Sequence, residues 1–272
     1  MEKNKLFVVA CSYSVTPKKI INQLEKYLSE FSLSGVIVIN NSHGFEFEHK
    51  DFLIIRGDNS LFEFSAYDQG IQSLLTIHRN ELSAPILIIN DTLFTKHNTK
   101  FILTKTIAYY NAISRISVCA MAGRFDPYNN ICFSSPWSNY PGYISSFCML
   151  VNQEAGMKIL DCYSKLPDNF NNNTINIKDK DWGNGIEPKL KEFIRSHLLD
   201  TETDTVWYQA RLYKDNNFRL DTKAKCVFME HYISGKVGAS GVLLSIIPTW
   251  KGRLLHFLNE QWAKMARVFS RI

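Results

Sequence analysis

Residues 86–92 read ILIINDT, in which four aliphatic residues are followed at once by Asn90, Asp91 and Thr92. An unbroken apolar run of this length is typical of a strand that is buried on both faces of a sheet. The same design, an apolar run and then a polar stop, recurs three times toward the N-terminus, at residues 6–14, 36–44 and 52–59. Helical patterns with one apolar face separate these runs, at residues 18–31 and 65–78.

Alternating strands and helices with short connections predict an open, mostly parallel α/β sheet with right-handed crossovers. In such a sheet, ligands bind beyond the carboxyl ends of the strands. The polar stops all lie at such ends, which places Asp91 at the centre of a predicted ligand crevice. Asp91 has a simpler alternative role, in which its side chain only caps the turn that follows it.

The rest of the chain is less regular. Its apolar patterns predict further helices at residues 99–110, 154–163 and 188–199. They also predict further strands at residues 116–122, 145–151 and 227–229. Two polar segments predict loops, one over the crevice at residues 123–142 and one at the surface at residues 168–181.

The net charge of +5 is concentrated in the tail at residues 233–272, which holds six bases and one acid, while the other 25 bases and 25 acids cancel. A neutral body without an aromatic and basic binding motif argues against a nucleic-acid partner. The six cysteines form no CxxC pair, and Met1–Lys5 leads directly into the first apolar run, so we expect a cytoplasmic protein.

Several well-known catalytic motifs are missing from the sequence. It contains no GxxxxGK[ST], no GxGxxG after the first apolar run, no HExxH and no GxSxG. These absences argue against P-loop NTPases, dinucleotide dehydrogenases, zinc proteases and serine hydrolases. A nucleotidyltransferase would need a triphosphate loop rich in Gly, Arg and Lys near the first strand, which is also missing.

The order of the polar stops resembles that of a GT-A glycosyltransferase, of the broad family two type found in bacterial O-antigen and capsule synthesis. In that family the first strand ends at a turn that holds the nucleotide base, and the second ends in an Asp-Asn-x-Ser-like stop, matched here by residues 40–42. The segment from Asp58 to the SAYDQG stretch at residues 65–70 is similar to the family's Asn- and Gly-containing segment. The family's fourth strand ends in Asp-x-Asp, where this sequence has NDT at residues 90–92 and keeps one carboxylate.

The resemblance implies a nucleotide-sugar donor and a divalent metal, Mg²⁺ or Mn²⁺, which would neutralise the leaving diphosphate. Asp91 would contact the metal and the diphosphate, and His231, after the predicted strand at residues 227–229, would be a further metal contact. The nucleotide would be held by polar residues at the strand ends and on the helix after the third strand: Ser12, Tyr13, Asn40, Asp58, Asp68 and Asn90.

An inverting transfer needs a general base near the acceptor hydroxyl. The family places an acid at the start of a helix on the acceptor side, and Glu187, directly before Pro188, is the best match. Asp126 and Asp181 are rivals for this role. Glu187 also has a structural alternative, because a carboxylate at a helix N-terminus pairs favourably with the helix dipole.

The sequence therefore predicts one catalytic domain at residues 1–232, with a nucleotide-binding half (1–100) and an acceptor-side half (101–232). The predicted activity is transfer, with inversion, of a hexosyl or deoxyhexosyl group from a nucleotide sugar to a glycan acceptor, a lipid-linked one in the setting of the family that the sequence resembles. The alternative is a catalytically silent module of the same fold that binds a partner or glycan in a polysaccharide assembly complex.

The tail at residues 233–272 predicts a basic amphipathic helix from about residue 251 to residue 271. Its apolar residues recur at spacings of three and four, and most of its bases fall off that stripe. Such a helix can lie in the interface of an anionic membrane, which would place the protein at the inner face of the cytoplasmic membrane. The alternative is a helix that packs on the body of the protein or on a second subunit.

Overall fold

The computed structural model describes the chain except for residues 1–2, 43, 45–46, 79–82, 129–134, 171–175, 200–209 and 270–272. Its centre is a seven-stranded sheet in the order β3-β2-β1-β4-β6-β5-β7. The strands are β1 (Lys5–Ser12), β2 (Ser32–Asn40), β3 (Leu53–Arg56), β4 (Ile86–Asn90), β5 (Cys119–Pro127), β6 (Gly142–Val151) and β7 (Gly241–Ser245). β6 runs antiparallel to both of its neighbours, and the other pairings are parallel.

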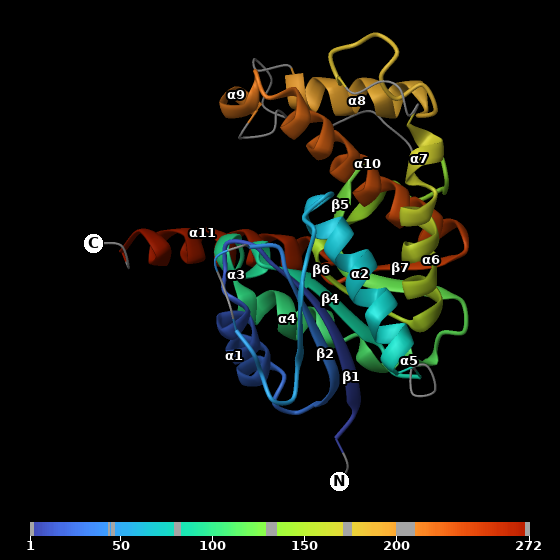
Figure 1. Ribbon diagram of the computed structural model, residues 1–272. Coiled ribbons are helices and arrows are strands. Elements are labelled where there is room, and N and C mark those ends of the chain that lie inside the picture. Colours follow the sequence, from blue (N-terminus) through green and yellow to red (C-terminus); the bar gives the residue numbers. More distant parts are fainter. Residues whose placement is uncertain are drawn as a thin grey trace.

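Helices cover both faces of this sheet (Figure 1). The strands alternate side chains between the two faces, so that Phe7 and Val9 of β1 enter one core while Leu6 and Val8 enter the other. The first core is covered by α2 (Phe62–Ile77), α6 (Gln153–Ser164), α8 (Pro188–Leu199) and α10 (Asn217–Ala239). The second is covered by α1 (Pro17–Tyr27), α4 (Thr99–Ile107) and α5 (Tyr110–Arg115).

Four shorter or peripheral helices complete the described chain: α3 (Thr92–Lys96), α7 (Leu166–Asn169), α9 (Ala210–Tyr213) and α11 (Trp250–Phe269). Figure 1 shows α11 passing α3 and α4 and extending away from the sheet. Among the residues that the structure describes, no helix is both long enough and apolar enough to span a bilayer.

The predicted α/β class and mostly parallel sheet are confirmed, and the strands and helices predicted before residue 90 occur close to their predicted positions. The helix predicted at residues 99–110 is divided into α4 and α5, and the strands predicted at 116–122 and 145–151 are β5 and β6. Part of the loops predicted at 123–142 and 168–181 lies outside the described residues.

The strand predicted at residues 227–229 is wrong, because these residues lie inside the 23-residue helix α10. The predicted boundary between residues 232 and 233 also falls inside this helix. Beyond it, β7 pairs in parallel with β5 and is therefore part of the sheet. The tail that stands apart from the sheet thus begins after Ile247, because residues 233–247 are held by the core and by backbone hydrogen bonds to β5.

Candidate functional site

The carboxyl ends of β1 and β4 meet at the point where the strand order reverses. From β1 the chain adds β2 and β3 on one side, and then returns to place β4 on the other side of β1. Crevices at such reversal points are the usual ligand sites of open α/β sheets. On the far side of β4, the antiparallel β6 pairs Cys148 with Ile89, so its residues before Cys148 extend past the end of β4.

A cavity of about 490 Å³ opens at this edge of the sheet. Its walls come from the turn after β1, the start of α2, the end of β4 with α3, the β5–β6 pair, and one side of α10. Polar and charged side chains dominate the lining, among them Asn41, Asn59, Glu63, Lys96, His97, Arg124, Asp126, Arg219, Lys223 and Glu230.

Asp91 holds the turn between β1 and α1 in place. Its Oδ2 atom accepts hydrogen bonds from the backbone N–H groups of Tyr13 (3.1 Å), Ser14 and Val15 (3.0 Å). The same oxygen also accepts from Oγ of Ser14 at 2.8 Å. The Asp91 side chain makes no capping hydrogen bond to α3, the helix that follows it. Instead, Oδ1 of Asn90 accepts from the Thr92 N–H at 3.0 Å. Asp91 is thus a tether across two strand ends rather than a cap on its own turn.

The predicted metal ligands do not meet in this arrangement. Asp91 lines the cavity, but its Oδ2 already accepts from several donors, and His231 is 1% exposed and is not among the cavity-lining residues. No group of three or more His, Cys, Asp or Glu side chains suited to a metal ion occurs in the described part of the chain. The described residues therefore do not fit the metal site that Asp91 and His231 were expected to form, and we derive no step through a metal.

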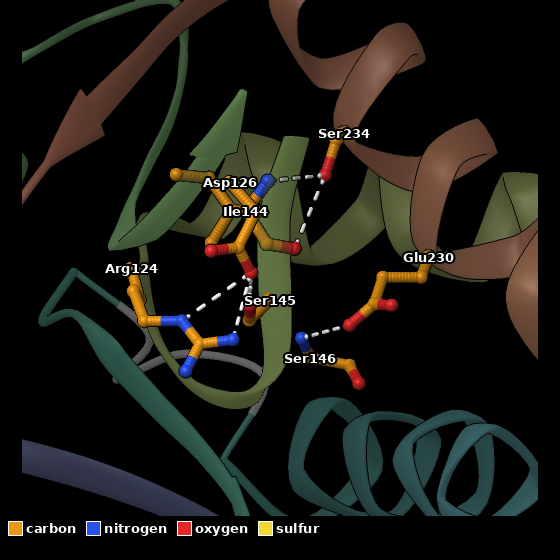
Figure 2. Close-up of polar contacts among 7 residues, drawn as sticks. All are labelled: Arg124, Asp126, Ile144, Ser145, Ser146, Glu230 and Ser234. Carbon is orange, nitrogen blue, oxygen red and sulfur yellow. Dashed lines mark hydrogen bonds and ion pairs between the residues drawn. The ribbon is translucent and has the colours of Figure 1, made fainter. Parts of the chain in front are cut away.

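A β-bulge aims Arg124 into the cavity. The β5–β6 register shifts between Gly123 and Phe125, which re-directs the residue between them. The Arg124 guanidinium donates to Oδ2 of Asp126 from Nε (3.3 Å) and from a terminal nitrogen (2.8 Å), and it lies 4.9 Å from the centre of the Phe147 ring. Oγ of Ser145 donates to the same Asp126 oxygen. Figure 2 shows these side chains converging between β5 and β6.

One face of α10 forms the opposite wall. Arg219, Lys223 and Glu230 all line the cavity, at helical spacings of four and seven residues. Ser234, one turn further along, accepts from the Ile144 N–H through Oγ at 3.0 Å. Glu230 accepts from the Ser146 N–H through Oε1 at 2.6 Å. The two α10 residues thus satisfy the backbone of β6 beyond the end of β4 (Figure 2).

The carboxyl group of Glu230 is half-buried between α10 and β6. Burial raises its pKa above the usual value for Glu, and the hydrogen bond from the Ser146 N–H offsets part of that effect. Asp126 is the negative group that raises the Glu230 pKa further. A carboxyl group in a cleft with a raised pKa is a candidate for proton transfer near neutral pH.

The cations of the cavity are placed to receive an anion. Arg219 lies over the ring of Phe62, with 4.5 Å between the guanidinium carbon and the ring centre, and Lys223 is the next residue along this face of α10. Phe62 itself has a φ of +48°, a left-handed conformation that is uncommon for a bulky residue, and its carbonyl oxygen accepts from Nδ2 of Asn41 at 3.0 Å. With Arg124 on the facing wall and Lys96 at the end of α3, four cationic side chains line the cavity.

Of the nucleotide contacts expected from the sequence, Tyr13 and Asn90 line this cavity together with Asp91. Ser12 is fully buried and donates to the Val15 carbonyl oxygen at 2.6 Å, and Asn40 is 8% exposed and accepts from the Ser42 N–H. These two residues shape the strand ends and are not among the residues that line the cavity.

Asp58 and Asp68 line a separate shallow hollow with Gln69, Gln72 and Tyr163. The structure therefore does not bring these two acids together with Asp91 around one cavity. Hydrogen bonds from Ser60 hold the pKa of Asp58 below its usual value against the opposing effect of burial, whereas burial raises the pKa of Asp68.

Glu187 and His231 lie apart from the cavity lining. Oε2 of Glu187 accepts from the Leu190 N–H at 2.9 Å, in the first turn of α8, which is the structural alternative that the sequence left open. His231 packs among aromatic rings and its Nδ1 lies 2.9 Å from the Tyr128 hydroxyl. Burial lowers the pKa of His231 from 6.5 to about 3. Of the two rivals of Glu187, Asp126 lines the cavity, and Asp181 is not among its lining residues.

No family model matches the sequence, and a search of curated proteins found no match either.

Proposed function

We propose that this chain is a glycosyltransferase of the GT-A type, which moves a sugar from a nucleotide-sugar donor to a glycan acceptor. One observation carries the proposal: the cavity at the sheet's reversal point combines four cationic side chains with a half-buried carboxyl group of raised pKa. Cations suit a diphosphate leaving group, and the carboxyl group suits removal of a proton from an acceptor hydroxyl.

In the proposed reaction the acceptor oxygen attacks the anomeric carbon of the donor sugar. Its proton passes to the Glu230 carboxylate, and the bond between the anomeric carbon and the diphosphate oxygen breaks with both electrons going to the oxygen. Arg219, Lys223 and Arg124 would neutralise the charge that develops on the diphosphate. Displacement in line, from the face opposite the leaving group, inverts the anomeric centre.

The base and ribose of the donor would lie toward the end of β1. Tyr13 is 46% exposed beside the cavity and offers a ring on which a nucleobase can stack. Asp91 contributes by fixing the backbone of this turn, so we assign it a positioning role. Donor binding with and without Mn²⁺ tests the Mg²⁺ or Mn²⁺ that the resemblance implies.

The experiment is a screen of nucleotide sugars against the purified full-length protein, with nucleoside diphosphate release as the readout and calorimetry for binding, with and without Mn²⁺. We expect release from one donor class. Glu230→Gln should retain donor binding and lose about 10²-fold or more of the turnover, because the amide cannot accept the proton. Glu187→Gln, a carboxyl-to-amide change outside the cavity, is the matched control and should keep full turnover.

Arg219→Gln and Lys223→Gln should each weaken donor binding about tenfold or more, since each removes a charge-assisted contact to the diphosphate. Full turnover by Glu230→Gln, or unchanged donor binding by both cation variants, would refute the assignment. Binding of no nucleotide sugar at all would refute the proposal as a whole.

A second candidate function is a catalytically silent binding module of the same fold. The observation that favours it is Asp91, which is already occupied as a backbone tether and leaves the region without a three-ligand metal cluster in the described residues. Such a module would bind a nucleotide sugar or a glycan in this cavity without releasing nucleoside diphosphate. The same screen separates the two functions, because binding without turnover by the unaltered protein identifies the module.

A further inference from the structure

The outer face of α11 is apolar and exposed. Four of its side chains near the start of the helix are about half-exposed: Leu254 (52%), Leu255 (50%), Phe257 (56%) and Leu258 (55%). Met265, two turns beyond Leu258, is 47% exposed. Spacings of three and four residues gather these side chains on one side of the helix. Solvent-facing stripes of this kind mark interaction surfaces in soluble proteins.

The orientation of α11 is the reverse of that of an ordinary surface helix. The side that meets the body carries His256, whose ring stacks on Phe101 of α4 with 5.7 Å between the ring centres. Gly252 lies on this side as well, where an added Cβ would be 3.3 Å from Cγ2 of Ile247. A helix that only needed to dock on the protein would bury its leucines against α4. Here the leucines face outward.

The charge of this region indicates what covers the leucines. Lys251 and Arg253 are exposed at the start of α11, and residues 233–272 carry the entire net charge of +5. Two copies of this chain joined through α11 would bring two such positive segments together, which is unfavourable. Apolar side chains flanked by exposed bases suit the boundary between anionic lipid headgroups and acyl chains. We infer that α11 docks the protein on an anionic lipid bilayer.

The bilayer would then lie close to an element that borders the cavity-lining residues. Lys96 and His97 are cavity-lining residues, and Asn98 begins α4 by accepting from the Phe101 N–H at 3.1 Å. Phe101 is the residue against which His256 of α11 stacks. The helix α4, which begins directly after two cavity-lining residues, is therefore the element that α11 contacts. If the proposed transfer is correct, this arrangement suits an acceptor that is anchored in the membrane, although the docking itself does not depend on the reaction.

The test is flotation of the full-length protein with phosphatidylcholine vesicles that contain about 30% phosphatidylglycerol, which gives them an anionic surface. Vesicles of phosphatidylcholine alone serve as the neutral reference. We expect binding to the anionic vesicles that weakens as salt is added. Leu254→Gln with Leu258→Gln should reduce the binding constant more than tenfold. Lys251→Gln with Arg253→Gln should reduce it roughly 25-fold, about fivefold for each charge.

The matched control is Ile77→Gln with Met157→Gln. These residues are exposed to a similar degree, 55% and 49%, but lie on α2 and α6, over the other face of the sheet. The control should float as the unaltered protein does. Melting temperatures within a few degrees of that protein establish that each variant is folded.

Three results would overturn the inference. The first is failure of the unaltered protein to float with anionic vesicles, and the second is an equal loss of binding in the control variant. The third is the absence of vesicle binding together with a dimer of the unaltered protein in sedimentation, where the Leu254→Gln, Leu258→Gln variant is a monomer. The last result would make the outer face of α11 an interface between copies. Nucleoside diphosphate release in the absence of vesicles is measured separately, so failure of membrane docking is distinguishable from failure of the proposed transfer.

Discussion

Replacement of Asp91 is predicted to damage the fold at the crevice before it affects any chemistry. In the Asp91→Ala variant the backbone N–H groups of Tyr13, Ser14 and Val15 lose their shared acceptor. The Ser14 hydroxyl can turn to water, since Ser14 lies at the exposed end of the turn. The three N–H groups are fixed by the backbone and cannot turn.

Each buried N–H left without a partner costs about 1–3 kcal/mol. Three buried groups would give roughly 3–9 kcal/mol, but Tyr13 and Ser14 are exposed and water can replace part of the bonding to their N–H groups, so we expect a loss near the lower end, about 3–5 kcal/mol. Asp91→Asn keeps one side-chain oxygen in place and removes only the charge. Because hydrogen bonds to a charged acceptor are roughly twice as strong as neutral ones, we expect this variant to lose about 1–2 kcal/mol.

Urea denaturation, followed by circular dichroism, measures both losses. Asp58→Ala is the control, because Asp58 is also an acid after a strand but is exposed and accepts from Ser60 in its own turn. That variant should lose less than about 1 kcal/mol. If Asp91→Ala unfolds within about 0.5 kcal/mol of the unaltered protein, the tether is not what holds this turn, and the positioning role is refuted.

Three further changes are predicted. Glu187→Ala should lower the free energy of unfolding by about 1 kcal/mol in urea denaturation, because the Leu190 N–H loses its capping hydrogen bond. The same variant should keep full turnover in the donor assay. Burial lowers the pKa of His231 from 6.5, its usual value, to about 3 in the folded protein. Between these two pH values the unfolded chain binds more protons than the folded one. The free energy of unfolding should therefore fall as the pH decreases, by up to about 1.4 kcal/mol per pH unit. His231→Phe should flatten that dependence in melts between pH 4 and 7, roughly the window of the shift; an unchanged slope contradicts the assignment. Gly70→Ala places a Cβ 2.4 Å from a valine methyl group of β1 and should cost about 1–3 kcal/mol, whereas Gly44→Ala, with open space around it, should cost little in the same melts.

The first half of the fold could be predicted because its information is local. β1 and β4 are buried along nearly their whole length, so each appears in the sequence as an unbroken apolar run with a polar stop. The strand order could not be read from these runs, because it depends on which faces the connecting helices cover. Asp91 was therefore placed correctly at a strand end, but its partner, the turn after β1, depends on β1 and β4 being neighbours.

The error at residues 227–229 has a different cause. α10 packs against α2, α6 and α8 and against β5, β6 and β7, so it is enclosed on most sides. Val227, Phe228 and Met229 are all buried, and a helix buried all round has no apolar stripe of helical period. The pattern that could have revealed the helix was polar: Arg219, Lys223, Glu230 and Ser234 recur at spacings of four and seven residues.

The choice of general base shows why burial has to be known before a carboxyl group can be assigned. Glu187 was selected by its place before a helix, and the structure uses it to cap that helix. Asp126 lies in the cavity, but its Oδ2 already accepts from both Arg124 and Ser145 and is not open to a substrate hydroxyl. Burial raises the pKa of Glu230 in spite of the opposing effects of Ser146 and Lys223, which makes it a stronger base than an ordinary carboxylate once it is ionised. Among these acids, the electrostatics of the cavity therefore favour Glu230, and a transfer rate that rises with pH in the unaltered protein but not in Glu230→Gln would follow from that choice.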